Sequence, residues 1–175
     1  MSRPLPLGTI RDRNPSASSS VLKAVPGGWF SWDFRIFEGE REIALLDRAW
    51  VRERGHFRLA GGVFDLYRDG LLGPFVLETE GRVLARAEKL SALRRIFRVT
   101  AGERRYTLKA ASPFRREFVL LQGERRVGSM RPESVLRRVA VAEFPEELPL
   151  PIRIFLVFLV LLLWKREASA APAGG

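Results

Sequence analysis

The sequence contains no cysteine and only one histidine among its 175 residues. The first absence excludes a disulfide framework, a thiolate metal site and a cysteine nucleophile. Any histidine-based metal site or Ser-His-Asp triad would have to include His56, which we interpret as a structural residue at a turn-to-strand boundary in RERGHFRL. A glycine-rich phosphate-binding motif is also missing, since LAGGVF at 59–64 is typical of a hairpin turn. We therefore predict that the protein is not an enzyme and has no cofactor and no metal.

Long apolar runs are scarce as well. The uninterrupted run Ile154–Trp164 has eleven residues and would be roughly 16 Å long as a helix, whereas the core of a bilayer is about 30 Å thick. Pro151 suits the first turn of a helix, and Lys165 and Arg166 complement the dipole at its end. We expect a helix over 151–167, and because it is apolar on every side, we expect it to be buried on every side.

Both ends of the chain are poor in residues that pack. The first 28 residues include RDRNPSASSS and several prolines, and they lack the apolar run of a secretory signal. The last residues, EASAAPAGG, are small and have no means of packing. We predict a flexible arm over 1–28, one domain over 29–167 and a disordered tail over 168–175.

Between the tails, apolar residues alternate with a period of two, which is typical of β-strands. One hairpin pattern begins at Phe34, at Phe75 and at Phe118, with offsets of 41 and 43 residues. Such recurrence indicates a closed or radially repeated antiparallel sheet, because one hairpin alone cannot bury its apolar face. Each copy carries an arginine after its turn, and these arginines either form an anion-binding ring or keep the hairpin ends solvated: Arg41, Arg82 and Arg125.

The strands and the helix fit one architecture. An antiparallel barrel of about a dozen strands is too wide for its own side chains to fill. The apolar helix over 151–167 has about the right size to fill it. We predict a mainly β fold of the α+β kind, a closed antiparallel barrel of about twelve strands around a central C-terminal hydrophobic helix.

The stretches GVFDLYRDGLLGPFVLETEGRVLARAEK and FRVTAGERRYTLKAAS resemble the repeated strand pairs of the tubby C-terminal-like superfamily. The similarity is to its scramblase and LURP-one-related branch, and it covers about Trp29 to Arg166. It implies a twelve-stranded barrel around a hydrophobic helix, and binding of phosphoinositides by basic side chains. Lipid translocation is not expected, because the chain has no acidic cluster with the spacing of a calcium loop and no cysteine-rich segment for palmitoylation.

Positive charge is concentrated in one segment. From Arg86 to Arg116 there are ten basic residues and two acidic ones, whereas Trp29 to Ala85 has eight basic and ten acidic residues. This polarity indicates an anionic partner, unless the arginines only keep the surface solvated.

Within that segment, LRRIFRVTAGERRYTLKA reads as two strands with a turn. We expect Phe97, Val99, Tyr106 and Leu108 to face the barrel interior, so that the opposite face carries cations suited to phosphate groups. Basic residues on the flanking turns extend this surface. The candidate anion-binding residues are Arg94, Arg98, Arg105, Lys109, Lys89, Arg115 and Arg116.

Three functions are compatible with this pattern. The first is a non-enzymatic scramblase-like or tubby-like domain that binds a lipid head group or another phosphorylated molecule. The second is a tail-anchored membrane protein with a cytosolic β-domain. The third is a nucleic-acid-binding barrel, which is disfavoured because no groove-reading helix and no stacking aromatic accompany the cations. We expect a cytoplasmic protein with membrane contact, and the oligomeric state stays open.

Overall fold

The computed structural model describes residues 19–28, 33–49, 54–90, 95–113, 115–134 and 138–170. These residues form twelve strands and one helix. The elements are β1 (Ser19–Pro26), β2 (Phe34–Glu38), β3 (Arg41–Ala49), β4 (Arg54–Leu59), β5 (Gly62–Arg68), β6 (Phe75–Thr79), β7 (Arg82–Lys89), β8 (Ile96–Ala101), β9 (Arg104–Ala110), β10 (Phe118–Gln122), β11 (Arg125–Pro132), β12 (Ala140–Pro145) and α1 (Leu150–Ala170).

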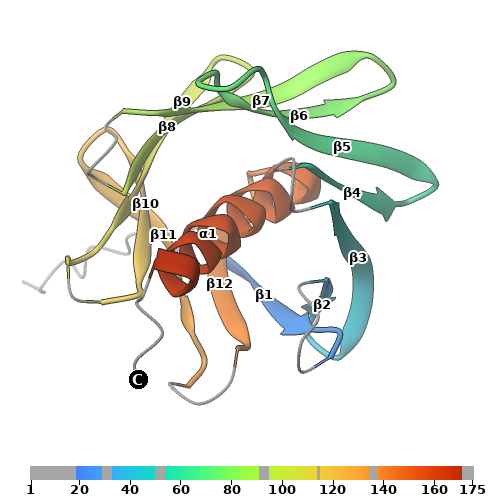
Figure 1. Ribbon diagram of the computed structural model, residues 1–175, viewed down its shortest axis with the longest axis horizontal. Helices are drawn as coiled ribbons and strands as arrows, with labels where there is room; N and C mark the ends of the chain where they lie inside the picture. The colour runs from blue at the N-terminus through green and yellow to red at the C-terminus, as the bar shows by residue number, and fades with distance from the viewer. Residues whose placement is uncertain are drawn as a thin grey trace, which may run out of the picture.

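The strands form a closed antiparallel barrel around α1 (Figure 1). Each strand pairs with its neighbours in sequence, and β1 pairs with β12 to close the ring. The helix is buried without interruption from Ile152 to Trp164, because the inward side chains of the strands contact it from every side. The predicted fold, a barrel of about twelve strands around an apolar helix, is confirmed. Within the described part of the chain, no helix is long and apolar enough to cross a membrane.

The predicted boundaries at both ends were wrong. The expected arm over 1–28 contains β1, in which Leu22 and Ala24 are only 1% and 2% exposed. The serines and prolines around β1 concealed its short alternating pattern. At the other end α1 continues through Ala170, so residues 168–170 of the expected tail are helical, and two of these three residues are alanine, the best helix former. Residues 1–18 and 171–175 lie outside the described part.

The three repeated hairpins are β2–β3, β6–β7 and β10–β11, one in every four strands. Each has a β-bulge at the same place, directly after the inward aliphatic residue of its first strand, and that residue faces a small one across the pair. The aliphatic and small partners are Ile36 and Ala44, Leu77 and Ala85, and Leu120 and Gly128. At Gly128 an added Cβ would lie 2.7 Å from the Glu143 carbonyl oxygen, so this position has no room for a side chain.

The repeated arginines begin β3, β7 and β11, and all three are exposed. They lie at the same end of the barrel but four strands apart, which is about 19 Å along the wall. One small anion therefore cannot contact more than one of them. The arrangement favours the interpretation that these side chains keep the hairpin ends solvated.

At the end of the barrel with the repeated hairpin turns, α1 begins with a charged contact. The guanidinium of Arg153 is 10% exposed and its Nη1 donates a hydrogen bond to Glu38 Oε1 over 3.3 Å. The Ser20 hydroxyl donates to the same carboxylate. The one cation in the apolar part of α1 is thus paired with the end of β2.

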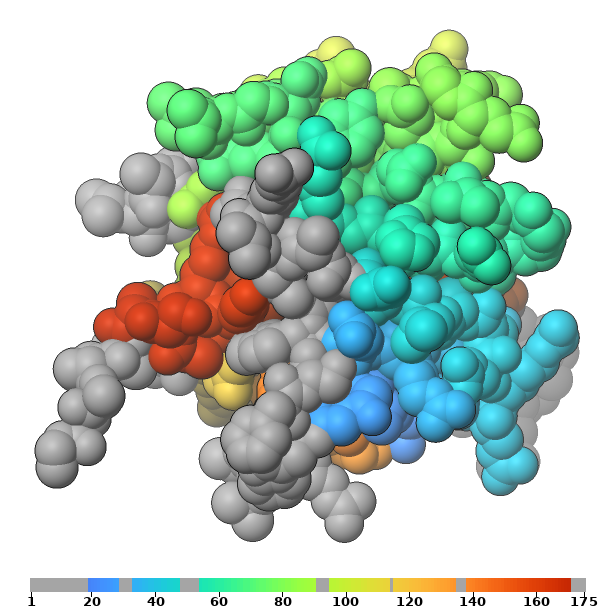
Figure 2. Space-filling model, turned by 45° about the vertical axis from the view of Figure 1, so that its right-hand side comes forward, coloured from blue at the N-terminus to red at the C-terminus, as the bar shows by residue number. Residues whose placement is uncertain are grey.

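The opposite end, which we call the mouth, is formed by residues 69–74, 111–113 and 115–117, by Arg95 and by the last turns of α1. Arg95 Nη1 donates to Glu167 Oε1 over 2.6 Å, and its Nη2 donates to the carbonyls of Ser112 and Pro113 over 3.1 and 2.8 Å. The Trp164 Nε1 donates to the Arg116 carbonyl over 3.1 Å. Here the red C-terminal part of α1 reaches the molecular surface (Figure 2).

Candidate anion-binding surface

Strands β8 and β9 turn one face to the helix and one to solvent. The predicted interior residues Phe97, Val99, Tyr106 and Leu108 are at most 4% exposed, which confirms their orientation. Because successive side chains of a strand alternate between faces, the basic residues between them must point outward.

The register of the two strands gathers three of the predicted cations. Arg98 on β8 is opposite Thr107, which lies between Arg105 and Lys109 on β9. Diagonal neighbours of this kind are about 7–8 Å apart. We call Arg98, Arg105 and Lys109 the basic face.

The charges of the basic face are largely unneutralised. Among the described residues, neither Arg105 nor Lys109 forms an ion pair. Arg98 Nη1 lies 3.8 Å from Glu88 Oε2, and the two side chains are 56% and 59% exposed. An ion pair this long and this exposed contributes little, so an incoming anion can displace it.

Three residues that sequence reasoning missed join this surface. Arg86 on β7 is opposite Thr100 on β8, which is opposite Arg105. Thr100 and Thr107 therefore place hydroxyl groups among the cations, and a hydroxyl can donate a hydrogen bond to a phosphate oxygen. The pairing register brings Arg86 to this group, whereas the alternation of side chains along β8 and β9 already places both threonines on the outer face.

The other predicted residues lie elsewhere. Lys89 ends β7 with a half-buried side chain, on the side of the strand that faces inward, and the exposed Arg115 and Arg116 lie in the connection from β9 to β10. All three are at the mouth. The guanidinium of Arg116 is 5.0 Å from the Trp164 ring centroid. Arg94 lies outside the described residues.

Two arginines of the mouth influence each other electrostatically. Burial, and then the neighbouring charge of Arg116, lower the pKa of Arg138, which lies before β12. A guanidinium next to another guanidinium is stabilised by an anion that contacts both. The structure therefore divides the predicted cations between the basic face and the mouth.

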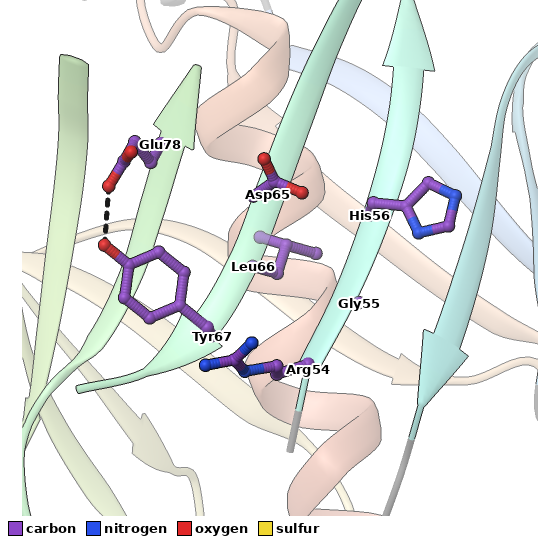
Figure 3. A pocket seen from close by; sticks show the side chains of 7 residues that line it. All are labelled: Arg54, Gly55, His56, Asp65, Leu66, Tyr67 and Glu78. Carbon is purple, nitrogen blue, oxygen red and sulfur yellow. Dashed lines mark hydrogen bonds between the residues drawn. The ribbon is translucent and has the colours of Figure 1, made fainter. Parts of the chain in front are cut away.

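A second surface feature is a hollow of about 490 Å³ on the outer side of β4, β5 and β6. Asp65 is opposite His56 on one side and Glu78 on the other (Figure 3). The Tyr67 hydroxyl donates a hydrogen bond to Glu78 over 2.5 Å. This hydrogen bond, burial and the charge of Glu78 raise the pKa of Tyr67, so its phenol stays neutral around pH 7.

The histidine of the hollow makes one long contact with an acidic residue. His56 Nε2 is 3.8 Å from Asp47 Oδ2, and the histidine side chain is 49% exposed. The structure thus places His56 on the outer wall within β4, and not at a boundary. Among the described residues, no three His, Asp or Glu side chains come close enough together to hold a metal ion. The hollow belongs to the acidic part of a charge-polarised wall.

Comparison of the chain with protein-family models, curated proteins and solved structures found no match.

Proposed function

We propose that this protein is a non-enzymatic, tubby-like or scramblase-like barrel domain whose basic face binds a phosphate-bearing anion, either a lipid head group or a phosphorylated molecule. The observation that carries the proposal is the register of β8 and β9, which sets Arg98, Arg105 and Lys109 on one outer surface.

The chemistry of this surface fits phosphate. Guanidinium groups bind phosphate through paired hydrogen bonds, and a lysine adds a mobile point charge. The cations project from paired strands over a filled core, so little backbone freedom is lost on binding. A closed barrel around a hydrophobic helix is also the architecture that the tubby-like resemblance implies, although membership of that superfamily stays a prediction.

The test is a triple charge reversal, Arg98→Glu, Arg105→Glu and Lys109→Glu. Binding is measured to vesicles of equimolar phosphatidylcholine and phosphatidylserine, and separately to inositol hexakisphosphate in solution. Each basic residue near an anionic surface contributes about 1 kcal/mol, and less with distance from that surface, so we expect affinity to fall at least about tenfold. Circular dichroism should be unchanged, because the three side chains point outward.

The matched control reverses the repeated arginines, Arg41→Glu, Arg82→Glu and Arg125→Glu, which changes the net charge equally. This variant should bind nearly as well as the unmodified protein. An equal loss of affinity in both variants would mean that only net charge matters. Unchanged binding after reversal of the basic face would overturn the proposal. Binding to vesicles alone identifies a lipid, and binding to the soluble polyphosphate alone identifies a free phosphorylated ligand.

A further inference from the structure

The connection from β5 to β6 exposes two large apolar side chains. Leu71 and Leu72 are 90% and 93% exposed, and no other large hydrophobic residue in the described part of the chain is exposed as much. Leaving two leucines in water is unfavourable by about 1.5–3 kcal/mol for each compared with burial. Such a pair at the end of a stable barrel indicates a surface that is buried on binding.

The base of this connection is fixed. The Asp69 amide donates to the Pro74 carbonyl over 2.9 Å, and Arg68 Nε donates to the Gly73 carbonyl over 3.3 Å. Gly70 has a φ of +76°, and a Cβ on Gly73 would lie 1.6 Å from the Asp69 carbonyl oxygen. Two glycines and two hydrogen bonds therefore close the loop tightly, and the leucine pair projects from its tip.

Three arginines surround the base of the loop. The guanidiniums of Arg68 and Arg166 lie 5.5 and 5.8 Å from the same ring centroid, that of Phe75. Arg86 Nη1 is 3.7 Å from Asp69 Oδ2. Arg166 belongs to the end of α1, so this loop is part of the same mouth that carries Lys89, Arg115 and Arg116.

We propose that the loop inserts Leu71 and Leu72 into the head-group and acyl boundary of an anionic bilayer, while Arg68, Arg86 and Arg166 contact lipid phosphates. An apolar tip within a ring of cations matches the layered chemistry of a lipid surface, in which phosphates lie above hydrocarbon. The guanidiniums of Arg68 and Arg166, and that of Arg86, which pairs loosely with Asp69, add positive charge around the apolar tip, and anionic lipid complements this charge. The inference rests on the proposed function and names its ligand as lipid, with the mouth turned toward the membrane.

The absence of cysteine makes insertion directly measurable. Leu72→Cys carries an environment-sensitive fluorophore, and the matched control is Leu45→Cys, on the outer wall of β3, where the leucine is 51% exposed. With vesicles of equimolar phosphatidylcholine and phosphatidylserine, the label at 72 should shift to the blue and be quenched by lipids that are spin-labelled on the acyl chain. The label at 45 should show neither change.

A second variant, Leu71→Ser with Leu72→Ser, measures the contribution of the tip. We expect vesicle affinity to fall about 100-fold, because two leucines no longer enter hydrocarbon, while affinity for inositol hexakisphosphate is unchanged. Leu45→Ser with Val63→Ser, which alters two exposed apolar residues on the wall, should leave both affinities as they are.

The outcomes separate this inference from the proposed function. A label at 72 that stays in water on vesicle-bound protein overturns insertion, and so does a serine variant that binds vesicles normally. Binding of the soluble polyphosphate without vesicle binding overturns insertion alone. If the label at 72 still inserts after reversal of the basic face, the proposed role of that face is overturned. If the protein binds neither vesicles nor inositol hexakisphosphate, both the insertion and the proposed function are overturned.

Discussion

Arg153 shows how one charged residue is accommodated inside an apolar helix. Its guanidinium is nearly buried and shares the Glu38 carboxylate with the Ser20 hydroxyl. A buried charge that loses its partner is strongly destabilising, because the attraction no longer offsets the desolvation of the ion.

Glu38→Gln should therefore lower the free energy of unfolding by about 2 kcal/mol, a value moderated by the partial exposure of Glu38. The control is Glu42→Gln on the same hairpin. Glu42 pairs with Arg35 at 2.7 Å, but the side chains are 36% and 54% exposed. Glu42→Gln should therefore lower the free energy of unfolding by less than about 1 kcal/mol. Urea denaturation measures both. Equal losses would show that Arg153 does not depend on Glu38.

At the level of single residues, the alternating pattern predicted which side chains of β8 and β9 are buried, because alternation between faces is a property of one strand. It did not predict that Arg86 joins the basic face, because that depends on the register between strands. The sequence also did not predict that Leu71 and Leu72 are exposed, since a pair of leucines is more often found in a core.

Among the secondary-structure elements, α1 is the one on which the barrel most depends. Its buried run from Ile152 to Trp164 contacts inward side chains such as Phe75, whose ring centroid is 6.3 Å from that of Phe158. Full burial of one large apolar side chain stabilises a fold by about 1.5–3 kcal/mol. The helix as a whole therefore contributes more than the 5–15 kcal/mol that is the usual net stability of a domain.

A chain that ends at Pro149 should consequently fail to fold. We expect it to aggregate and to lack a cooperative thermal transition, while the full chain, expressed beside it and fractionated without detergent, remains in solution. The opposite result, a folded truncated chain and a full-length chain that pellets with membranes, would make α1 a membrane anchor and would contradict its role as the barrel core.

The elements also show where prediction from the sequence succeeded and why it stopped. The three hairpins were recognised because their glycine turns and inward aliphatic residues recur at matching positions, and the structure adds that each repeat contains the same bulge. Strand β1 was missed because SSVLKAVP has only a few apolar residues. Its place in the barrel is fixed by pairing with β2, the next strand, and with β12, which lies far away in sequence, so the local pattern did not reveal it.

On the scale of the whole molecule, the basic face and the leucine loop lie on one side of a polarised barrel. Lys109 is opposite Ile96, the first residue of β8, and is therefore near the mouth, whereas Arg105 is opposite Thr100 and is farther from it. The two cations are four residues apart on β9, which is about 13 Å in a strand. That separation exceeds the screening length of about 8 Å at physiological ionic strength.

The two single reversals, Lys109→Glu and Arg105→Glu, therefore report how the barrel meets a bilayer. If the mouth faces the membrane with the leucine tip inserted, Lys109→Glu should weaken vesicle binding about tenfold and Arg105→Glu less than about threefold, because only Lys109 lies within the screening length of the lipid phosphates. Both variants change the net charge by the same amount, so each controls for the other. Vesicle sedimentation at physiological salt measures the difference. Equal losses would mean that the wall formed by β8 and β9 lies flat on the membrane, which is incompatible with a mouth-first orientation.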